Sequence, residues 1–125
     1  MTPSLERWQV YYLLCRYTKP HPKNKYIVIA CIEPKILGFL INSRINPFIT
    51  NRPYLLPCEV TIRTVTHPFL NHDSFVDCRD AFEFTEAELG IPLGMVDEPT
   101  RVGILEAVRV CPVIKRSAKR YILQV

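Results

Sequence analysis

Proton transfer needs a group that exchanges a proton near neutral pH, and binding of an acidic partner needs cations. The first half of the chain holds suitable side chains. His21 lies in a proline-rich loop with Lys19 and Lys23, and Lys25 follows at the start of an apolar run. Histidine exchanges protons near neutral pH, and lysine stabilises negative charge. This group is either a substrate-facing loop or a solvated hairpin loop, and the residues alone favour neither interpretation.

A second polar group follows the next apolar run. Asn42, Ser43 and Arg44 stand directly after it and offer neutral and charged hydrogen-bond donors. Asp77 lies later in the chain between apolar neighbours. An acid in such a position is more often a structural hydrogen-bond acceptor than a catalytic base, and both interpretations stay open.

The other histidines and the cysteines give weaker signals. His67 and His72 are alternatives for proton transfer, and we place both after His21 because no motif surrounds them. Cys78 could be a nucleophile, but a structural thiol is the favoured interpretation. The cysteines are odd in number and widely spaced, without a CxxC or CxxH pattern, at positions 15, 31, 58, 78 and 111. We therefore expect no metal, no cofactor, and buried thiols in a reducing compartment.

The elements that position these groups are mainly strands. Residues 25–32 and 36–41 are apolar runs rich in β-branched and aromatic side chains, separated by a proline-containing break that argues against one long helix. In an antiparallel hairpin, Lys25 opens one strand and Asn42 follows the end of the next, so both lie at one end of the sheet. We therefore expect Lys25, Asn42 and the nearby His21 to line one electropositive pocket.

The rest of the pattern completes a β-rich domain. Further strands are expected at residues 8–16, 58–64 and 74–84, with an irregular segment at 44–56 and one helical turn at 85–89. Asp97 or Thr100 would cap a longer helix that Pro112 ends. The tail from residue 115 could be a docked last element or an RNA-facing patch, but a solvated helix or strand edge is the favoured interpretation. We predict one mainly β domain over residues 1–125, with a strongly bent antiparallel sheet and a C-terminal helix.

Composition limits the possible environments and partners. The 125 residues carry a net charge of +4 and a pI near 8.9, a mild preference for acidic partners such as nucleic acid. No apolar run approaches the length of a membrane span, and the first residues lack a signal-peptide core. We expect a cytoplasmic protein that contacts no membrane.

Several segments, taken in order, resemble the MazF/PemK toxin family. The stretch from Thr18 to His21, followed by Lys25, stands where that family has a Thr-x-Gly-His type loop and then an Arg-Pro. Leu40-Ile-Asn42-Ser43 stands at the strand end that carries a Thr-Ser or Thr-Thr pair in the family. Pro57-Cys-Glu-Val resembles its Pro-Phe-Glu-Val strand, and Val76-Asp77-Cys78 resembles the strand with a buried Asp-Gln. Lys25 replaces the family's arginine, and Asn42 replaces its catalytic threonine.

The resemblance implies a CcdB-like fold, which is an SH3-like small barrel with a C-terminal helix, and a homodimer. It also implies a toxin-like, metal-independent endoribonuclease that cleaves single-stranded RNA and pairs with an antitoxin protein. The residues that would take part are His21, Lys25, Asn42 and Asp77 in catalysis, and Lys19, Lys23, Ser43 and Arg44 in RNA binding. The alternative is a non-catalytic barrel module that binds RNA, or binds a protein as the gyrase-poisoning toxins do.

Overall fold

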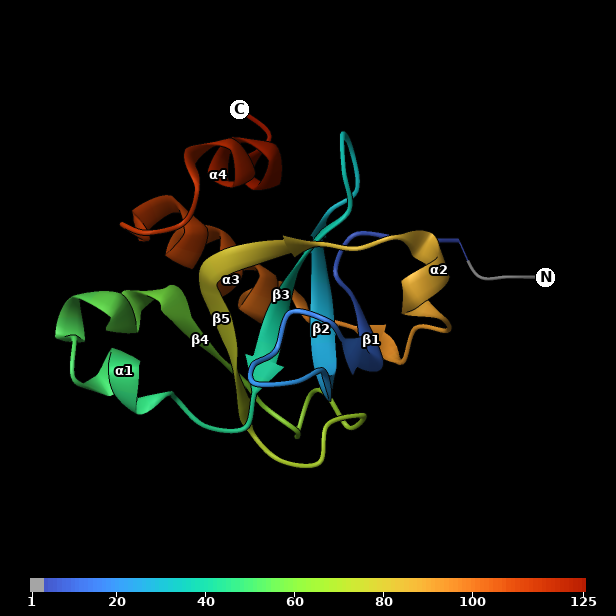
Figure 1. The fold of residues 1–125 in the computed structure, drawn as a ribbon, viewed down its shortest axis with the longest axis horizontal. Coiled ribbons are helices and arrows are strands. Elements are labelled where there is room, and N and C mark those ends of the chain that lie inside the picture. Colours follow the sequence, from blue (N-terminus) through green and yellow to red (C-terminus); the bar gives the residue numbers. More distant parts are fainter. Residues whose placement is uncertain (1–3) are drawn as a thin grey trace.

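The computed structural model describes residues 4–125, which form a strongly curled, six-stranded antiparallel sheet with helices packed around it (Figure 1). The order across the sheet is β4-β5-β3-β2-β1-β6. The strand bounds are β1 Gln9–Cys15, β2 Lys23–Cys31, β3 Leu37–Asn42, β4 Glu59–Ile62, β5 Ser74–Glu83 and β6 Gly94–Met95. The predicted mainly β fold, with a bent antiparallel sheet and helix at the C-terminal side, is confirmed.

The two central apolar runs form the expected hairpin. β2 and β3 are antiparallel neighbours, with Tyr26 opposite Ile41 and Val28 opposite Phe39. Their side chains are almost continuously apolar because both faces of this pair are covered. One step outward from the Tyr26 and Ile41 pair, Lys25 and Asn42 therefore meet at the same end of the sheet.

Each face of the sheet has its own apolar cluster. One cluster joins Phe39 and Val76 to Ile104 of α3 (Glu98–Val110) and Ile122 of α4 (Arg116–Leu123). The cluster on the other face includes Tyr11, Ile27, Ile29, Phe84 and Leu89, the last from α2 (Glu86–Leu89). With both faces covered in the middle, polar side chains gather where the strands end.

Helix ends follow the expected chemistry. Asp97, rather than Thr100, caps α3, because its side chain accepts a hydrogen bond from the Thr100 backbone N–H at 3.1 Å. The helix ends before Pro112, as expected. The helical turn predicted at 85–89 is α2, and Gly90 follows it with a φ of 73°.

Three segments differ from the sequence-based expectation or complete it. The segment 44–56, predicted to be irregular, contains α1 (Pro47–Thr50), and the 3-10 helix η1 (Pro53–Cys58) begins within it. Both are too short to show a periodic pattern, and each has a proline in its first turn. β6 pairs with β1 over only two residues, which was not predicted. The tail is a docked helix, α4, which buries Ala118 and Ile122.

The cysteines and the helices bear on two further expectations. All five cysteines are buried free thiols, as their apolar neighbours predicted. Within residues 4–125, the helices lack the combination of length and apolarity that crossing a bilayer requires.

Candidate functional site

Lys25 and Asn42 lie side by side at one end of the sheet. The Lys25 Nζ donates a hydrogen bond to the Asn42 Oδ1 at 2.5 Å. Burial lowers the pKa of Lys25 and the charge of Lys23 lowers it further, whereas Asp77 acts in the opposite direction. Among the described residues, the direct partner of this half-buried ammonium is a neutral amide, so its charge stays available to an anion.

A hollow of about 300 Å³ opens at the same end of the sheet. Its lining comes from four strands and the β4–β5 connection, and consists of Tyr12, Asn24, Lys25, Tyr26, Ile41, Ser43, Asn71, His72 and Ser74. The rings of Tyr12 and Tyr26 pack with their centres 4.7 Å apart, and Tyr12 is half exposed. The hollow therefore combines a histidine, hydroxyl groups and an aromatic surface on which a base could stack. Lys25 borders it, but its side chain alternates with that of Tyr26 along β2, and its ammonium bonds to Asn42 at the sheet end.

His72, rather than His21, shares this hollow with Lys25. His21 and Lys19 are exposed in the connection between β1 and β2, where the Thr18 hydroxyl accepts a hydrogen bond from the Lys23 backbone N–H at 2.8 Å. Of the three residues expected in one pocket, only Lys25 lines the hollow. Asn42 contacts Lys25 but is not part of the lining, and His21 lies outside it. His72 could not be selected from the sequence, because its connection reaches Lys25 only through the pairing of β5 with β3.

His67 has a structural environment. The side chain is fully buried, and its Nε2 accepts a hydrogen bond from the Asp97 backbone N–H at 3.0 Å. Its Nδ1 lies 2.8 Å from the Arg63 carbonyl oxygen, to which it can donate. Both ring nitrogens therefore join the β4–β5 connection to the start of α3, and the ring is closed to a substrate.

Asp77 holds an arginine in place. The Arg79 Nε and Nη2 donate to the two carboxylate oxygens of Asp77 at 3.0 and 2.9 Å. Burial opposes the charge on Asp77, but the hydrogen bonds from Arg79 and Glu59 and the charge of Arg79 together hold the pKa of Asp77 below its ordinary value. With its side chain only 12% exposed, Asp77 is a hydrogen-bond acceptor that positions Arg79. This agrees with the more frequent of its two sequence-based interpretations.

Glu59 is a functional candidate that the sequence did not reveal. It pairs with Asp77 across β4 and β5, and Asp77 in turn pairs with Leu40 of β3. Residues that lie opposite one another share a face, so Glu59 and Asp77 lie together beside the sheet end that carries Asn42. Both carboxyl oxygens of Glu59 are shielded from solvent and accept no hydrogen bond from the described residues, whereas a protonated Glu59 can donate one to Asp77. Burial raises the pKa of Glu59 to about 8, and the charge of Asp77 adds to the shift.

The protonated state of Glu59 should be visible as a pH dependence of stability. Its folded-state pKa of about 8 lies above the ordinary value of 4.5, so the folded chain binds this proton more tightly between these pH values. The associated stability is fully present below about pH 4.5 and is lost as the pH rises toward 8. Glu59→Gln removes this dependence. We compare the melting temperature of Glu59→Gln minus that of wild type at two pH values. This difference should be at least about 3 °C higher at pH 8 than at pH 5.

The exposed Glu33 supplies a matched control for that measurement. Glu33→Gln removes an exposed carboxylate instead of a shielded one. The difference between its melting temperature and that of wild type should therefore be the same at both pH values. Thermal unfolding followed by circular dichroism measures all three proteins. Parallel curves for wild type and Glu59→Gln across this range would show that Glu59 is ionised in the folded chain.

Other predicted RNA contacts surround the site. Ser43 lines the hollow, while Arg44 and Lys23 are exposed near the ends of β3 and β2. Two arginines also approach the ring of Phe48. The Arg79 guanidinium lies 5.7 Å from the ring centre, and the Arg52 guanidinium lies 3.7 Å from it. Among residues 4–125, no three histidine, cysteine or acidic side chains come close enough to form a metal-binding cluster. The described groups are suited to binding a polyanion.

Comparison with known proteins finds a similar fold but no matching family model or curated sequence. No protein-family model and no curated sequence matches the chain. Among solved structures, it is similar to an endoribonuclease in complex with its cognate antitoxin from a mycobacterial species. The TM-score is 0.59 at 18% sequence identity, and the match covers 83% of this chain and 90% of that one. At this identity the likeness concerns the fold.

Proposed function

We propose that this chain is a metal-independent endoribonuclease of the toxin type, which cleaves single-stranded RNA and is controlled by an antitoxin protein. The observation that carries the proposal is the contact between Lys25 and Asn42 at the strand ends, beside a hollow with His72. The solved neighbour is an endoribonuclease with its cognate antitoxin, which supports the same activity and the same kind of partner for this chain.

The proposed reaction is an attack of the ribose 2′-oxygen on the adjacent phosphorus. His72 takes the proton of the 2′-hydroxyl, and the bond from phosphorus to the 5′-oxygen breaks, leaving a 2′,3′-cyclic phosphate and a 5′-hydroxyl end. Lys25 stabilises the charge on the phosphorus centre. Because its pKa is lowered, Lys25 is also a better proton donor than an ordinary lysine, and it gives a proton to the leaving 5′-oxygen.

The remaining groups bind and orient the RNA in this proposal. Asn42 and Ser43 hydrogen-bond to the phosphate or to a base, and Arg79, held by Asp77, adds a fixed positive charge. Exposed cations along the rim contact neighbouring phosphates, namely Lys19, Lys23 and Arg44. His21, in the loop beside them, is the second candidate for proton transfer. A homodimer acting in the cytoplasm belongs to the same proposal, since a two-fold axis would double the basic surface.

Digestion of single-stranded RNA by the purified protein in excess EDTA tests the function. We expect fragments that end in a 2′,3′-cyclic phosphate, identified by mass spectrometry, and a rate that added Mg²⁺ leaves unchanged. Double-stranded RNA of the same sequence serves as the control and should stay intact. Binding of the RNA without any cleavage would contradict the nuclease proposal and favour the non-catalytic barrel module.

A further inference from the structure

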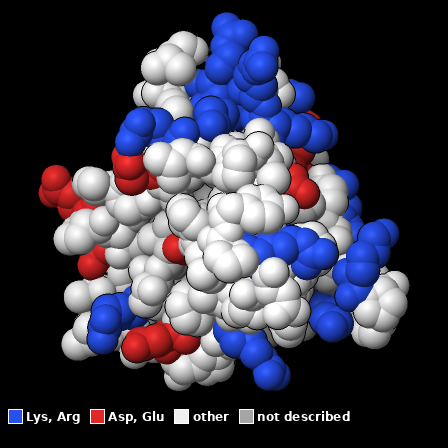
Figure 2. Space-filling model, turned by 90° about the vertical axis from the view of Figure 1, so that its left-hand side faces the viewer, with Lys and Arg blue, Asp and Glu red and all other residues white. Residues whose placement is uncertain are grey.

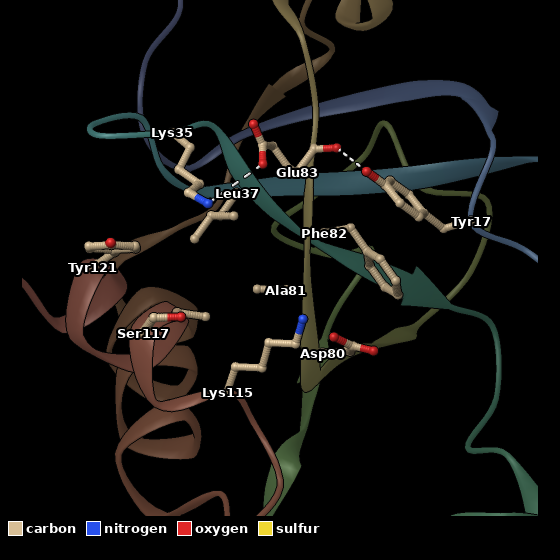
Figure 3. Close-up of a pocket in the computed structure, with 11 residues that line it drawn as sticks. Tyr17, Lys35, Leu37, Asp80, Ala81, Phe82, Glu83, Lys115, Ser117 and Tyr121 are labelled. Atoms are coloured by element: carbon tan, nitrogen blue, oxygen red, sulfur yellow. Dashed lines mark hydrogen bonds and ion pairs between the residues drawn. The ribbon is translucent and has the colours of Figure 1, made fainter.

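A second hollow, of about 420 Å³, lies at the other end of β3 from Asn42. It opens between the C-terminal half of β5, the turn after β2, and α4 (Figure 3). β4 pairs with β5 only up to Asp77, so the part of β5 that lines the hollow extends beyond β4. The fold thus leaves a strand segment and a helix facing each other across a space that their side chains do not fill.

Aromatic rings stand on two sides of this hollow. The rings of Tyr17 and Phe82 pack on one side with their centres 4.7 Å apart, and the Tyr17 hydroxyl donates to the Glu83 carbonyl oxygen at 2.5 Å. Tyr121 of α4 lies on the opposite side, with Leu37 and Ala81 between them (Figure 3). Partly exposed rings around an apolar floor are suited to a flat, partly apolar group such as a nucleobase.

Two lysines point into the hollow from opposite sides (Figure 3). Lys35, from the turn after β2, lies 3.8 Å from a Glu83 carboxylate oxygen, which is a long and exposed ion pair. Lys115, just before α4, extends toward the same space near Asp80. The lysines are suited to phosphates, and the two carboxylates are suited to accepting hydrogen bonds from amino groups of a base.

The surroundings favour an anionic ligand. Figure 2 shows Lys and Arg side chains gathered at the top of the molecule, where Figure 1 places α4. Lys115, Arg116 and Arg120 are exposed there, and the chain from residue 115 to 125 contains no acidic residue. Lys119 is different because its Nζ donates to the carbonyl oxygens of Arg109 and Cys111, which joins α4 to the end of α3. Three cations of this helix segment thus stay available to a polyanion.

We propose that this hollow binds one nucleotide of the RNA substrate, several nucleotides from the cleaved bond. The base stacks on Tyr121 over Leu37 and Ala81, and the flanking phosphates contact Lys35 and Lys115. β3 separates Leu37 in this hollow from Asn42 at the cleavage site by five residues, or about 17 Å in a strand. A single extended RNA strand can span that distance. The identity of the ligand rests on the proposed function, whereas the shape and charge of the hollow do not.

Binding of a non-cleavable RNA tests the proposal separately from catalysis. The probe is a single-stranded 2′-O-methyl RNA of about ten nucleotides of mixed sequence, labelled for fluorescence anisotropy. Lys115→Glu should weaken its binding by about tenfold or more and reduce the salt dependence, because a phosphate contact is lost. Tyr121→Ala should weaken binding to a similar extent with little change in the salt dependence, because stacking is lost.

The control matches the change in charge. Arg63→Glu reverses one exposed charge in the β4–β5 connection, outside both hollows, and should alter affinity by less than about twofold. Because Tyr121 is partly buried, circular dichroism must show that Tyr121→Ala is folded. If Tyr121→Ala does not fold, the test rests on Lys115→Glu, because Lys115 is exposed. NMR of the Ala81 and Ala118 methyl groups gives a second readout, since both line the hollow and should shift when the probe binds.

The outcomes separate this inference from the proposed function. If the probe binds wild type, Lys115→Glu and Tyr121→Ala equally, the hollow is not a nucleotide subsite. That result would leave the proposed RNA cleavage beside Lys25 untouched. If the variants lose affinity but wild type cleaves no RNA, the subsite is supported and the nuclease fails. If wild type does not bind the probe, or if the variants lose affinity only for an acidic protein partner, the subsite proposal is overturned.

Discussion

Lys25→Ala should lower kcat/KM for RNA cleavage by on the order of 10³-fold, the range measured when one preorganised donor to a developing negative charge is removed. The half-buried ammonium hydrogen-bonds to the neutral Asn42, so its charge is not cancelled by a directly bonded carboxylate before the substrate arrives. Alanine removes both this charge and the proposed proton donor. The measurement is the cleavage rate in EDTA of a fluorophore- and quencher-labelled RNA, for wild type and variant at equal enzyme concentration.

Lys25→Arg divides the two roles of the ammonium. Arginine keeps the positive charge and binds phosphate well, but it does not release a proton near neutral pH. We therefore expect KM close to that of wild type and a kcat lower by on the order of 10²-fold. Arg63→Ala, which removes an exposed charge elsewhere, should leave both constants unchanged. An unchanged rate in Lys25→Ala would exclude this end of the sheet as the site of cleavage.

The position of Lys25 beside Asn42 could be predicted from the sequence because it depends on one local hairpin. Two apolar runs separated by a short turn have few alternatives to antiparallel pairing, and such pairing brings the start of one strand to the end of the next. His72 and Glu59 depend instead on how β4 and β5 add to this hairpin. Single residues in the intervening loops carry no signal for that register, so neither residue could be assigned to the site in advance.

The same distinction between local and distant contacts applies to the fold. The cap of α3 at Asp97 and the stop before Pro112 follow from residues within one or two turns, and both were predictable. In contrast, Glu59 stands in β4, a strand in which polar and apolar residues alternate. Its carboxyl oxygens are shielded where Asp77 pairs with it from β5, which eleven intervening residues separate from β4. The residues of β4 alone therefore do not indicate that Asp77 lies opposite Glu59.

His72→Ala should lower the rate of RNA cleavage by on the order of 10²-fold with little change in RNA affinity. His72 is exposed and lines the same hollow as Lys25 and Ser43, so a bound phosphodiester could reach all three. Loss of a proton acceptor slows the attack of the 2′-oxygen but removes no positive charge that the binding step requires. Single-turnover cleavage measures the rate, and anisotropy with 2′-O-methyl RNA measures the affinity.

His21→Ala is the decisive comparison, because the sequence favoured His21 and the geometry favours His72. His21 lies outside the lining of the hollow, in an exposed loop, so its removal should slow cleavage by less than about fivefold. Imidazole added to His72→Ala should restore part of the lost rate, because a small base can occupy the space that the side chain leaves; added to His21→Ala, it should have no effect. The reverse result, with His21→Ala slow and rescued by imidazole, would assign proton transfer to the loop and require it to close over the RNA.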